Sequence, residues 1–279
     1  MVLERLYSMQ WIEQKARYAF IMGLSYSILG IATAIFLFPD NPGLVAIAFT
    51  SLLILPSLQK LLALEESQAA RENFFNIFKL FKDHSDIFKI YFFMFLGILL
   101  SFAFFSLVWP PLATSRIFAE QSSFILGGAT GKAATGGILS MLIANNFKVL
   151  IVALLASLFY GTGAVFIITW NASVWGVIFG LIAKNSAAAA GTHPTIFFIL
   201  MLIAVFPHMA FEAFAYFLGA ISGGVLSKAV IREKLFSNRF NQIIKDSMMM
   251  FILAVIVVII AALIEVYFTG HVISLFGLF

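Results

Sequence analysis

Two ionisable side chains, His208 and Glu212, lie four residues apart within a long apolar stretch. In a helix this spacing places both on one face. A histidine and a glutamate so arranged can relay protons, supply two ligands to a metal ion, or form a buried hydrogen-bonded pair that holds the helix in register. The buried pair is favoured over a proton or ion path. A metal site is the least expected, because no second histidine lies on a neighbouring apolar segment.

Pro207 directly precedes this pair. Proline has no backbone N–H, so it leaves the carbonyl of Ile203, four residues earlier, without its helical donor. The sequence therefore predicts a helix kink at Pro207, with a free carbonyl beside His208.

Three further polar residues lie in apolar segments: Glu265, Asn146 and Asn171. An ionisable group in a membrane span is costly unless it is paired. Pairing would offset this cost if His208 and Glu212 lay at the depth of Glu265, in the outer half of the bundle. We expect these five residues to form one intramembrane polar network.

The composition explains why so few residues are candidates. Of the 279 residues, 62% are hydrophobic and 11% are charged, against about 25% charged in a soluble domain. Such a chain cannot cover a water-facing surface, which excludes a soluble enzyme and a disordered protein. Cysteine is absent, which excludes disulfides, thiolate metal sites and cysteine nucleophiles.

Apolar runs long enough to cross a bilayer predict an all-α, polytopic transmembrane helix bundle of about seven spans. The expected spans are 19–38, 44–64, 90–109, 146–169, a short run at 172–183, 195–227 and 247–268. The run 172–183 is too short by itself. Either the boundary moves back to Gly161-Thr162-Gly163, which makes 164–183 a full span, or 146–183 is a pair of broken helices that meet at Trp170-Asn171. Residues 112–144 are expected to be an outer segment.

Lysine and arginine predict the orientation. Most of them fall in segments 1–18, 60–89 and 228–245, and fewer in the segments on the other side, which hold Arg116, Lys132, Lys148 and Lys184. The positive-inside rule then places the chain in a cell membrane with a cytoplasmic N-terminus and an outer C-terminus. The net charge of +4 is thus a sign of topology, and we expect no nucleic-acid partner.

Two inner segments, 65–89 and 228–245, mix aromatic and aliphatic residues with basic ones at helical spacing. They are expected to be interfacial amphipathic helices and candidate docking sites for proteins. The whole chain, 1–279, is interpreted as one transmembrane domain, in which 1–84 forms an N-terminal hairpin with an amphipathic segment and 85–270 forms the main bundle. The Gly-xxx-Gly pairs at 176–180 and 219–223 favour internal helix crossing, while a homo-oligomer stays open.

Enzyme motifs are incomplete. The glycine-rich run 127–133 lacks two positions that a phosphate loop needs, and there is no His-Glu-x-x-His or Gly-x-Ser-x-Gly sequence. Glu65-Glu66 with Arg71 resembles a motif of CAAX-type intramembrane proteases, but its arginine comes one residue too late. We expect no enzymatic activity and no cofactor.

An ordered set of residues resembles the stage II sporulation protein M family of integral membrane proteins. It comprises Asn145-Asn146 opening a span, Gly161-x-Gly163, Asn171 with Gly176 and Gly180, Pro207-His208 with Glu212, and Ile264-Glu265-x-Tyr267. The resemblance covers about residues 85–270.

The resemblance implies a scaffold. The bacterial namesake of the family looks like a membrane anchor that recruits cell-wall hydrolases during spore engulfment, and it is not itself a hydrolase. The sporulation role does not transfer, because the family also occurs in organisms that do not sporulate. The expected function is therefore an integral membrane scaffold or assembly factor. The alternative is a permease or channel subunit with an ion or proton path through His208, Glu212 and Glu265.

Overall fold

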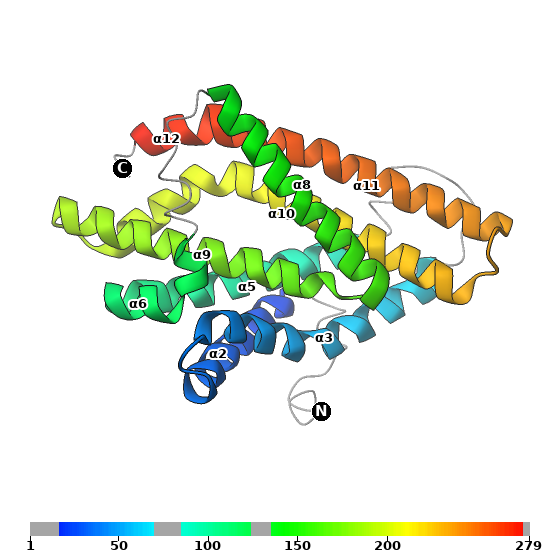
Figure 1. Ribbon diagram of the computed structural model, residues 1–279, viewed down its shortest axis with the longest axis horizontal. Coiled ribbons are helices and arrows are strands. Elements are labelled where there is room, and N and C mark those ends of the chain that lie inside the picture. The colour runs from blue at the N-terminus through cyan, green and yellow to red at the C-terminus, as the bar shows by residue number, and fades with distance from the viewer. Residues whose placement is uncertain (1–16, 70–84, 124–134, 276–279) are drawn as a thin grey trace.

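The computed structural model describes residues 17–69, 85–123 and 135–275, and helices are the only regular secondary structure in these ranges (Figure 1). The elements are α2 (Tyr18–Leu37), α3 (Pro42–Ala69), α5 (Ser85–Val108), α6 (Pro111–Ile117), α8 (Thr135–Tyr160), α9 (Ala164–Ala190), α10 (Pro194–Arg232), α11 (Asn238–Ile264), the π-helical segment η2 (Glu265–Thr269) and α12 (Gly270–Leu275). Seven helices, with α11 continuing through η2, are long and apolar enough to cross a membrane. The expected all-α transmembrane bundle is confirmed.

α10 occupies the centre of the bundle (Figure 1). It packs against α8, α9 and α11, and α9 packs in turn against α5. α5 also packs against α2, which forms a hairpin with α3. This arrangement places the helix that carries the candidate pair between three neighbours.

Both Gly-xxx-Gly motifs are used for close crossing inside the chain. A Cβ atom at Gly176 would lie 2.4 Å from the carbonyl oxygen of Leu99 in α5, and one at Gly223 would lie 2.3 Å from a backbone carbonyl oxygen of α8. Side chains at these positions would force the helices apart. The motifs at 176–180 and 219–223 therefore join α9 to α5 and α10 to α8.

The fourth and fifth spans differ from their predicted bounds. α8 ends at Tyr160, and the turn Gly161-Thr162-Gly163 leads into α9 at Ala164. Gly161 has a φ of 67°, in the left-handed region that glycine adopts without strain. The span predicted as 146–169 is thus wrong, as is the alternative of a break at Trp170-Asn171. The alternative of a full span beginning at residue 164 is correct.

The predicted outer segment 112–144 is also partly wrong. Its first residues form α6, and α8 already begins at Thr135. Apolar residues at 138–139 and 141–143 let this helix start earlier than its glycine- and alanine-rich composition suggested. Asn146 therefore lies in the middle of a span and does not open one.

The two segments expected as separate amphipathic helices belong to the ends of longer helices. Residues 65–69 continue α3 and 85–89 begin α5, while 70–84 lie outside the described residues. In 228–245, α10 runs to Arg232 and α11 begins at Asn238. At these places the helices that contain the apolar spans continue into the neighbouring polar sequence.

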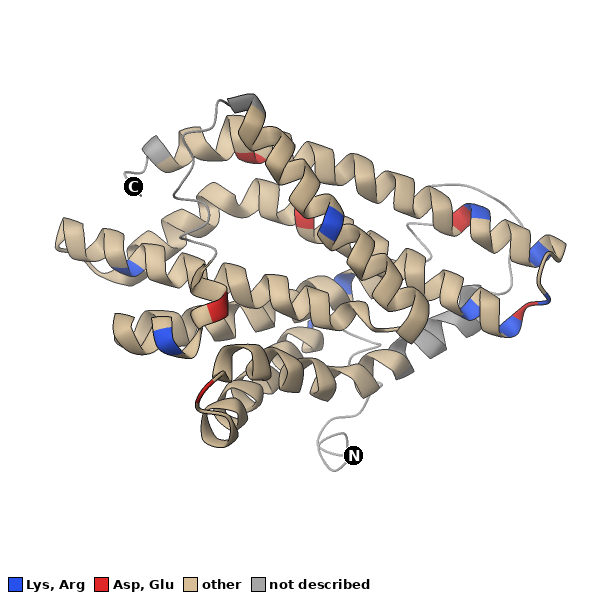
Figure 2. Ribbon diagram, in the orientation of Figure 1, with Lys and Arg blue, Asp and Glu red and all other residues tan. Residues whose placement is uncertain are grey.

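Basic residues collect where α10 ends and α11 begins, at the right of Figure 2. We call this region, residues 228–245, the basic end. It carries Lys228, Arg232, Lys234, Arg239 and Lys245. The structure confirms a chain with several membrane passes, and the cytoplasmic location of this end stays a prediction of the positive-inside rule.

Candidate functional site

His208 and Glu212 lie on the buried face of α10, with 9% and 7% of their surface exposed. Both are nearer to Pro194, at the start of the helix, than to Arg232, at its end. His208 lies roughly 20 Å from the first residue and 35 Å from the last, at about 1.5 Å per residue. α10 continues through Pro207 as one element, so the helix is not broken beside the pair.

Each member of the pair has its own hydrogen-bond partner. The Tyr216 hydroxyl, one turn further along α10, donates to Glu212 Oε1 at 2.6 Å. His208 Nδ1 and Thr269 Oγ1 share a hydrogen bond of 2.9 Å. Tyr216 and Thr269 are also buried, so both bonds are closed off from solvent and lipid. Among the described residues, His208 and Glu212 form no hydrogen bond with each other.

Glu265 and Thr269 are the first and last residues of η2, the π-helical segment that interrupts the final helix. π-Helical turns are rare and often occur at functional sites. This segment packs against α10, and Glu265 lies close enough to Glu212 for the two carboxyl groups to interact electrostatically. The fold thus brings His208, Glu212 and Glu265 into one region, although they come from two elements.

Asn146 is buried on α8. Its side-chain oxygen accepts a 3.4 Å hydrogen bond from the neighbouring Asn145. The packing of α8 on α10 gives the depth of Asn146 in the bundle. Leu150 of α8 lies against Gly219 of α10, and Asn146 and Ala215 each come four residues, about one helical turn, before these two. The same register places Asn146 at the level of Ala215, next to Tyr216. Asn146 therefore lies at the depth of the polar cluster.

Asn171 is not joined to this cluster by a described hydrogen bond. Its amide nitrogen donates to the carbonyl oxygen of Ile167 at 2.8 Å, within α9 itself. Such a bond to the carbonyl four residues earlier satisfies the side chain without a partner helix. The five residues of the expected network are therefore not joined by one chain of described hydrogen bonds. His208 and Glu212 each have a separate buried bond, Glu265 lies near them, and the two asparagines bond to residues of their own helices.

This arrangement offers little chemistry. A relay needs continuous hydrogen-bonded contact between its members, and here the two bonds lead to a tyrosine and a threonine. Metal binding needs about four ligands at fixed geometry. Within residues 17–69, 85–123 and 135–275, no three histidine, aspartate or glutamate side chains are grouped to hold a metal ion.

Sequence reasoning did not find Tyr216 and Thr269, because tyrosine and threonine are ordinary residues in spans. Tyr216 follows Glu212 by four residues, the spacing that had already singled out the pair, and this was a usable signal. The sequence analysis also placed Lys148 and Lys184 in outer segments between the spans, which is wrong. Both lie within spans, in α8 and α9, and Lys184 Nζ donates to the carbonyl oxygens of Ser106, at 2.8 Å, and of Trp109.

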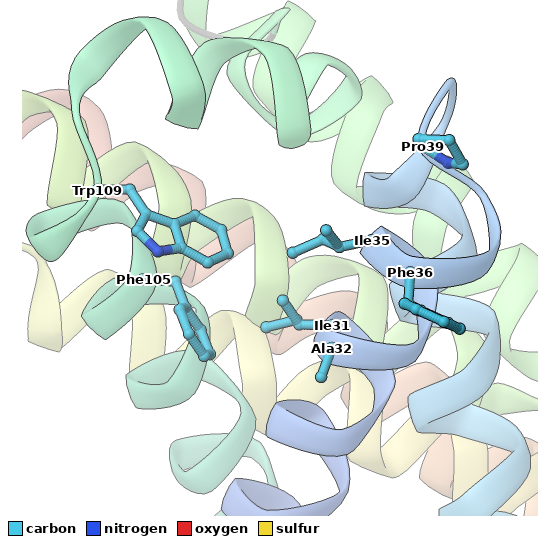
Figure 3. A pocket seen from close by; sticks show the side chains of 7 residues that line it. All are labelled: Ile31, Ala32, Ile35, Phe36, Pro39, Phe105 and Trp109. Carbon is cyan, nitrogen blue, oxygen red and sulfur yellow. The ribbon is translucent and has the colours of Figure 1, made fainter.

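An apolar groove of about 470 Å³ lies between α2 and α5 (Figure 3). It is lined by Ile31, Ala32, Ile35, Phe36, Pro39, Phe105 and Trp109. This lining provides no acid, base or nucleophile. Since Phe36 is 85% exposed, the groove opens to the side of the bundle, where lipid chains can enter it.

The chain was compared with protein-family models, with curated proteins and with solved structures. No curated protein and no solved structure gives a significant match. The family model of stage II sporulation protein M matches residues 44–270. This range takes in most of α3 and all later spans, so it extends beyond the residues that carried the sequence resemblance. The chain belongs to the stage II sporulation protein M family of membrane proteins.

Proposed function

We propose that this family member is a membrane scaffold or assembly factor that recruits partner proteins and is not itself an enzyme. One observation carries the proposal. The ionisable pair in the centre of the bundle is buried, and each member is hydrogen-bonded to a neutral neighbour, His208 to Thr269 and Glu212 to Tyr216. This is how a protein offsets the cost of polar groups in lipid while keeping its helices in register.

A transport path would need a different arrangement. Groups that carry ions or protons line a hydrated route and occur at several depths. Here His208, Glu212 and Glu265 lie in one half of α10 and in the η2 segment packed against it. The half of α10 that leads to the basic end instead presents Ser222, which exchanges hydrogen bonds with Ser247 of α11 at 2.7–2.9 Å. That contact closes the helix interface.

The basic end offers a surface for docking. Ile231, Leu235 and Phe236 are exposed there by 77%, 56% and 82%, beside Arg232 and Lys234. Phe236 also has a φ of 62°, which is uncommon for a large side chain and is sustained only where the surroundings hold it. Apolar and basic side chains together fit the headgroup region of a bilayer, and they also fit an amphipathic partner lying on it.

Purified protein in proteoliposomes tests the proposal. We expect no pH-driven or ion-driven flux above that of empty liposomes, for the wild type and for Glu212→Gln alike. We expect Glu212→Gln to act on thermal stability instead. A flux through the wild type that Glu212→Gln abolishes would overturn the scaffold as the main role.

Recruitment is tested in native membranes with a photo-crosslinking amino acid at position 236. The expected product is a discrete protein adduct that is absent when the same group stands at Ile199, an exposed position near the other end of α10. Adducts to lipid alone at both positions would contradict docking at the basic end.

A permease or channel subunit is the second candidate. The observation that favours it is the electrostatic interaction of Glu212 with Glu265, because carboxyl groups that interact in a bundle are candidates for binding a proton or cation. The same flux assay decides between the two functions.

A further inference from the structure

α8 has the smallest buried share of the seven candidate spans. Its inner face packs on α10, while its opposite face is open along its length. We call six residues on that face the outward stripe: Met141, Asn145, Lys148, Val152, Leu155 and Phe159. All six are exposed.

The outward stripe has the spacing of a helix-packing seam. Its members follow one another at alternating steps of four and three residues, as the a and d positions of a heptad do. The stripe is about 27 Å long at 1.5 Å per residue, close to the roughly 30 Å of a hydrocarbon core. A single helix crossing the membrane beside α8 can contact all of it.

Lys148 makes this face unsuitable for lipid. It lies midway between the ends of the span Gly137–Tyr160, roughly 17 Å along the helix from either end. Lysines near helix ends extend to the headgroups, but a stem of four methylene groups does not cover this distance. Within the described ranges Lys148 forms no hydrogen bond or ion pair. A cation at this depth needs an anionic partner.

We propose that the outward stripe of α8 docks a transmembrane helix of another protein, and that a carboxylate in the middle of that helix pairs with Lys148. The apolar members of the stripe supply packing, and Asn145, one turn away, offers an amide beside the ion pair. One polar position among apolar ones fixes the register and the choice of partner in such seams.

A second copy of this chain fits the face poorly. In a two-fold dimer about the membrane normal, each α8 meets the other at the same depth, so Lys148 would face Lys148. Like charges at close range in a low-dielectric medium repel strongly. The proposal rests on the scaffold function, and it specifies the partner as a single-span or multi-span protein with an acidic residue at mid-membrane depth.

The probe is a synthetic polyleucine transmembrane peptide with one central glutamate, and its binding to the labelled full-length protein is measured by energy transfer in liposomes. We expect it to bind about tenfold more tightly than the same peptide with leucine at the centre. Lys148→Met should remove the difference and Lys148→Arg should keep it. Lys89→Met is the control, because Lys89 lies at the start of α5 and pairs with Asp86 at 2.7 Å.

Equal binding of both peptides to the wild type would overturn the proposal, as would a preference that survives Lys148→Met. The chain has no cysteine, so Val152→Cys gives a clean second test. Disulfide-linked dimers formed on membrane-permeable oxidation would show that a second copy occupies the face, and this too overturns the proposal. None of these three results bears on the scaffold function, which fails only through the flux assay or the cross-linking at position 236.

Discussion

Replacing Tyr216 by phenylalanine removes one hydroxyl group from the polar cluster and leaves the ring in place. That hydroxyl donates to Glu212 Oε1 at 2.6 Å, and Glu212 is 7% exposed. After the substitution, neither water nor lipid can replace the lost donor. The variant should therefore unfold more easily, although it loses almost no buried surface.

The size of the effect follows from the setting. A hydrogen bond between neutral groups is worth about 0.5–1.5 kcal/mol in a soluble protein. In a bilayer, polar contacts between helices average about 0.6 kcal/mol and reach about 1.7 kcal/mol, since the unfolded helices also find partners. The Tyr216–Glu212 bond lies within α10 and can also form in the separated helix, but it is short and enclosed in the bundle, so we expect a loss of about 1 kcal/mol.

Tyr91→Phe is the matched control. Tyr91 and Tyr216 are both 1% exposed. The ring of Tyr91 stacks on Phe217, but no described hydrogen bond involves its hydroxyl group. Unfolding in mixed detergent micelles, followed by circular dichroism, should show a clear loss of stability for Tyr216→Phe and a change within about 0.5 kcal/mol for Tyr91→Phe. Equal effects of the two substitutions would refute the argument that the Glu212 bond stabilises the bundle.

Three further predictions concern the helix interfaces and the topology. Gly176→Ala brings a Cβ to 2.4 Å from a backbone oxygen of α5, whereas a Cβ at Gly270 meets nothing within 4 Å. In the same unfolding assay, the first should lose about 1–3 kcal/mol and Gly270→Ala should lose none; equal stabilities would contradict the close crossing. Lys184→Met leaves two carbonyl groups at the end of α5 without their donor and should cost about 1–3 kcal/mol; unchanged stability would show that water replaces the lysine. In intact cells, an impermeant maleimide should label Leu112→Cys, and should label Ile231→Cys only after permeabilisation; the reverse pattern would invert the predicted orientation.

The number of spans was predictable because run length and hydropathy are local properties. The boundary between α8 and α9 was predicted only as one of two alternatives. Gly161-Thr162-Gly163 lies between apolar residues on both sides, so it looks like a packing motif inside one helix. It becomes a turn because Gly161 adopts a positive φ, and a Cβ at Gly163 would lie 2.3 Å from the carbonyl oxygen of Ala156. Apolar periodicity does not report either feature, because both are properties of the backbone at the turn.

The shared helix face of His208 and Glu212 was predictable, but the residue that partners His208 was not. Helical spacing is enough to place His208 and Glu212 on one face. The partner of His208 comes from η2, where a π-helical turn shifts the residues that follow it relative to a regular α-helix. A helical wheel drawn for α11 therefore assigns Thr269 to the wrong face of the helix, and no pattern in the sequence predicts the π-helical turn.

Four ionisable groups of the spans, His208, Glu212, Lys184 and Lys148, differ in whether the fold supplies a partner, and the difference bears on function. His208, Glu212 and Lys184 obtain partners from within the chain, so the fold already offsets the cost of burying them. Lys148 obtains none in the described residues and lies on the outward stripe at mid-depth. A bilayer does not stabilise such a charge, so its stabilisation has to come from another molecule. Because Lys148 also lies on an exposed face of α8, it marks the surface where we infer that a partner helix binds.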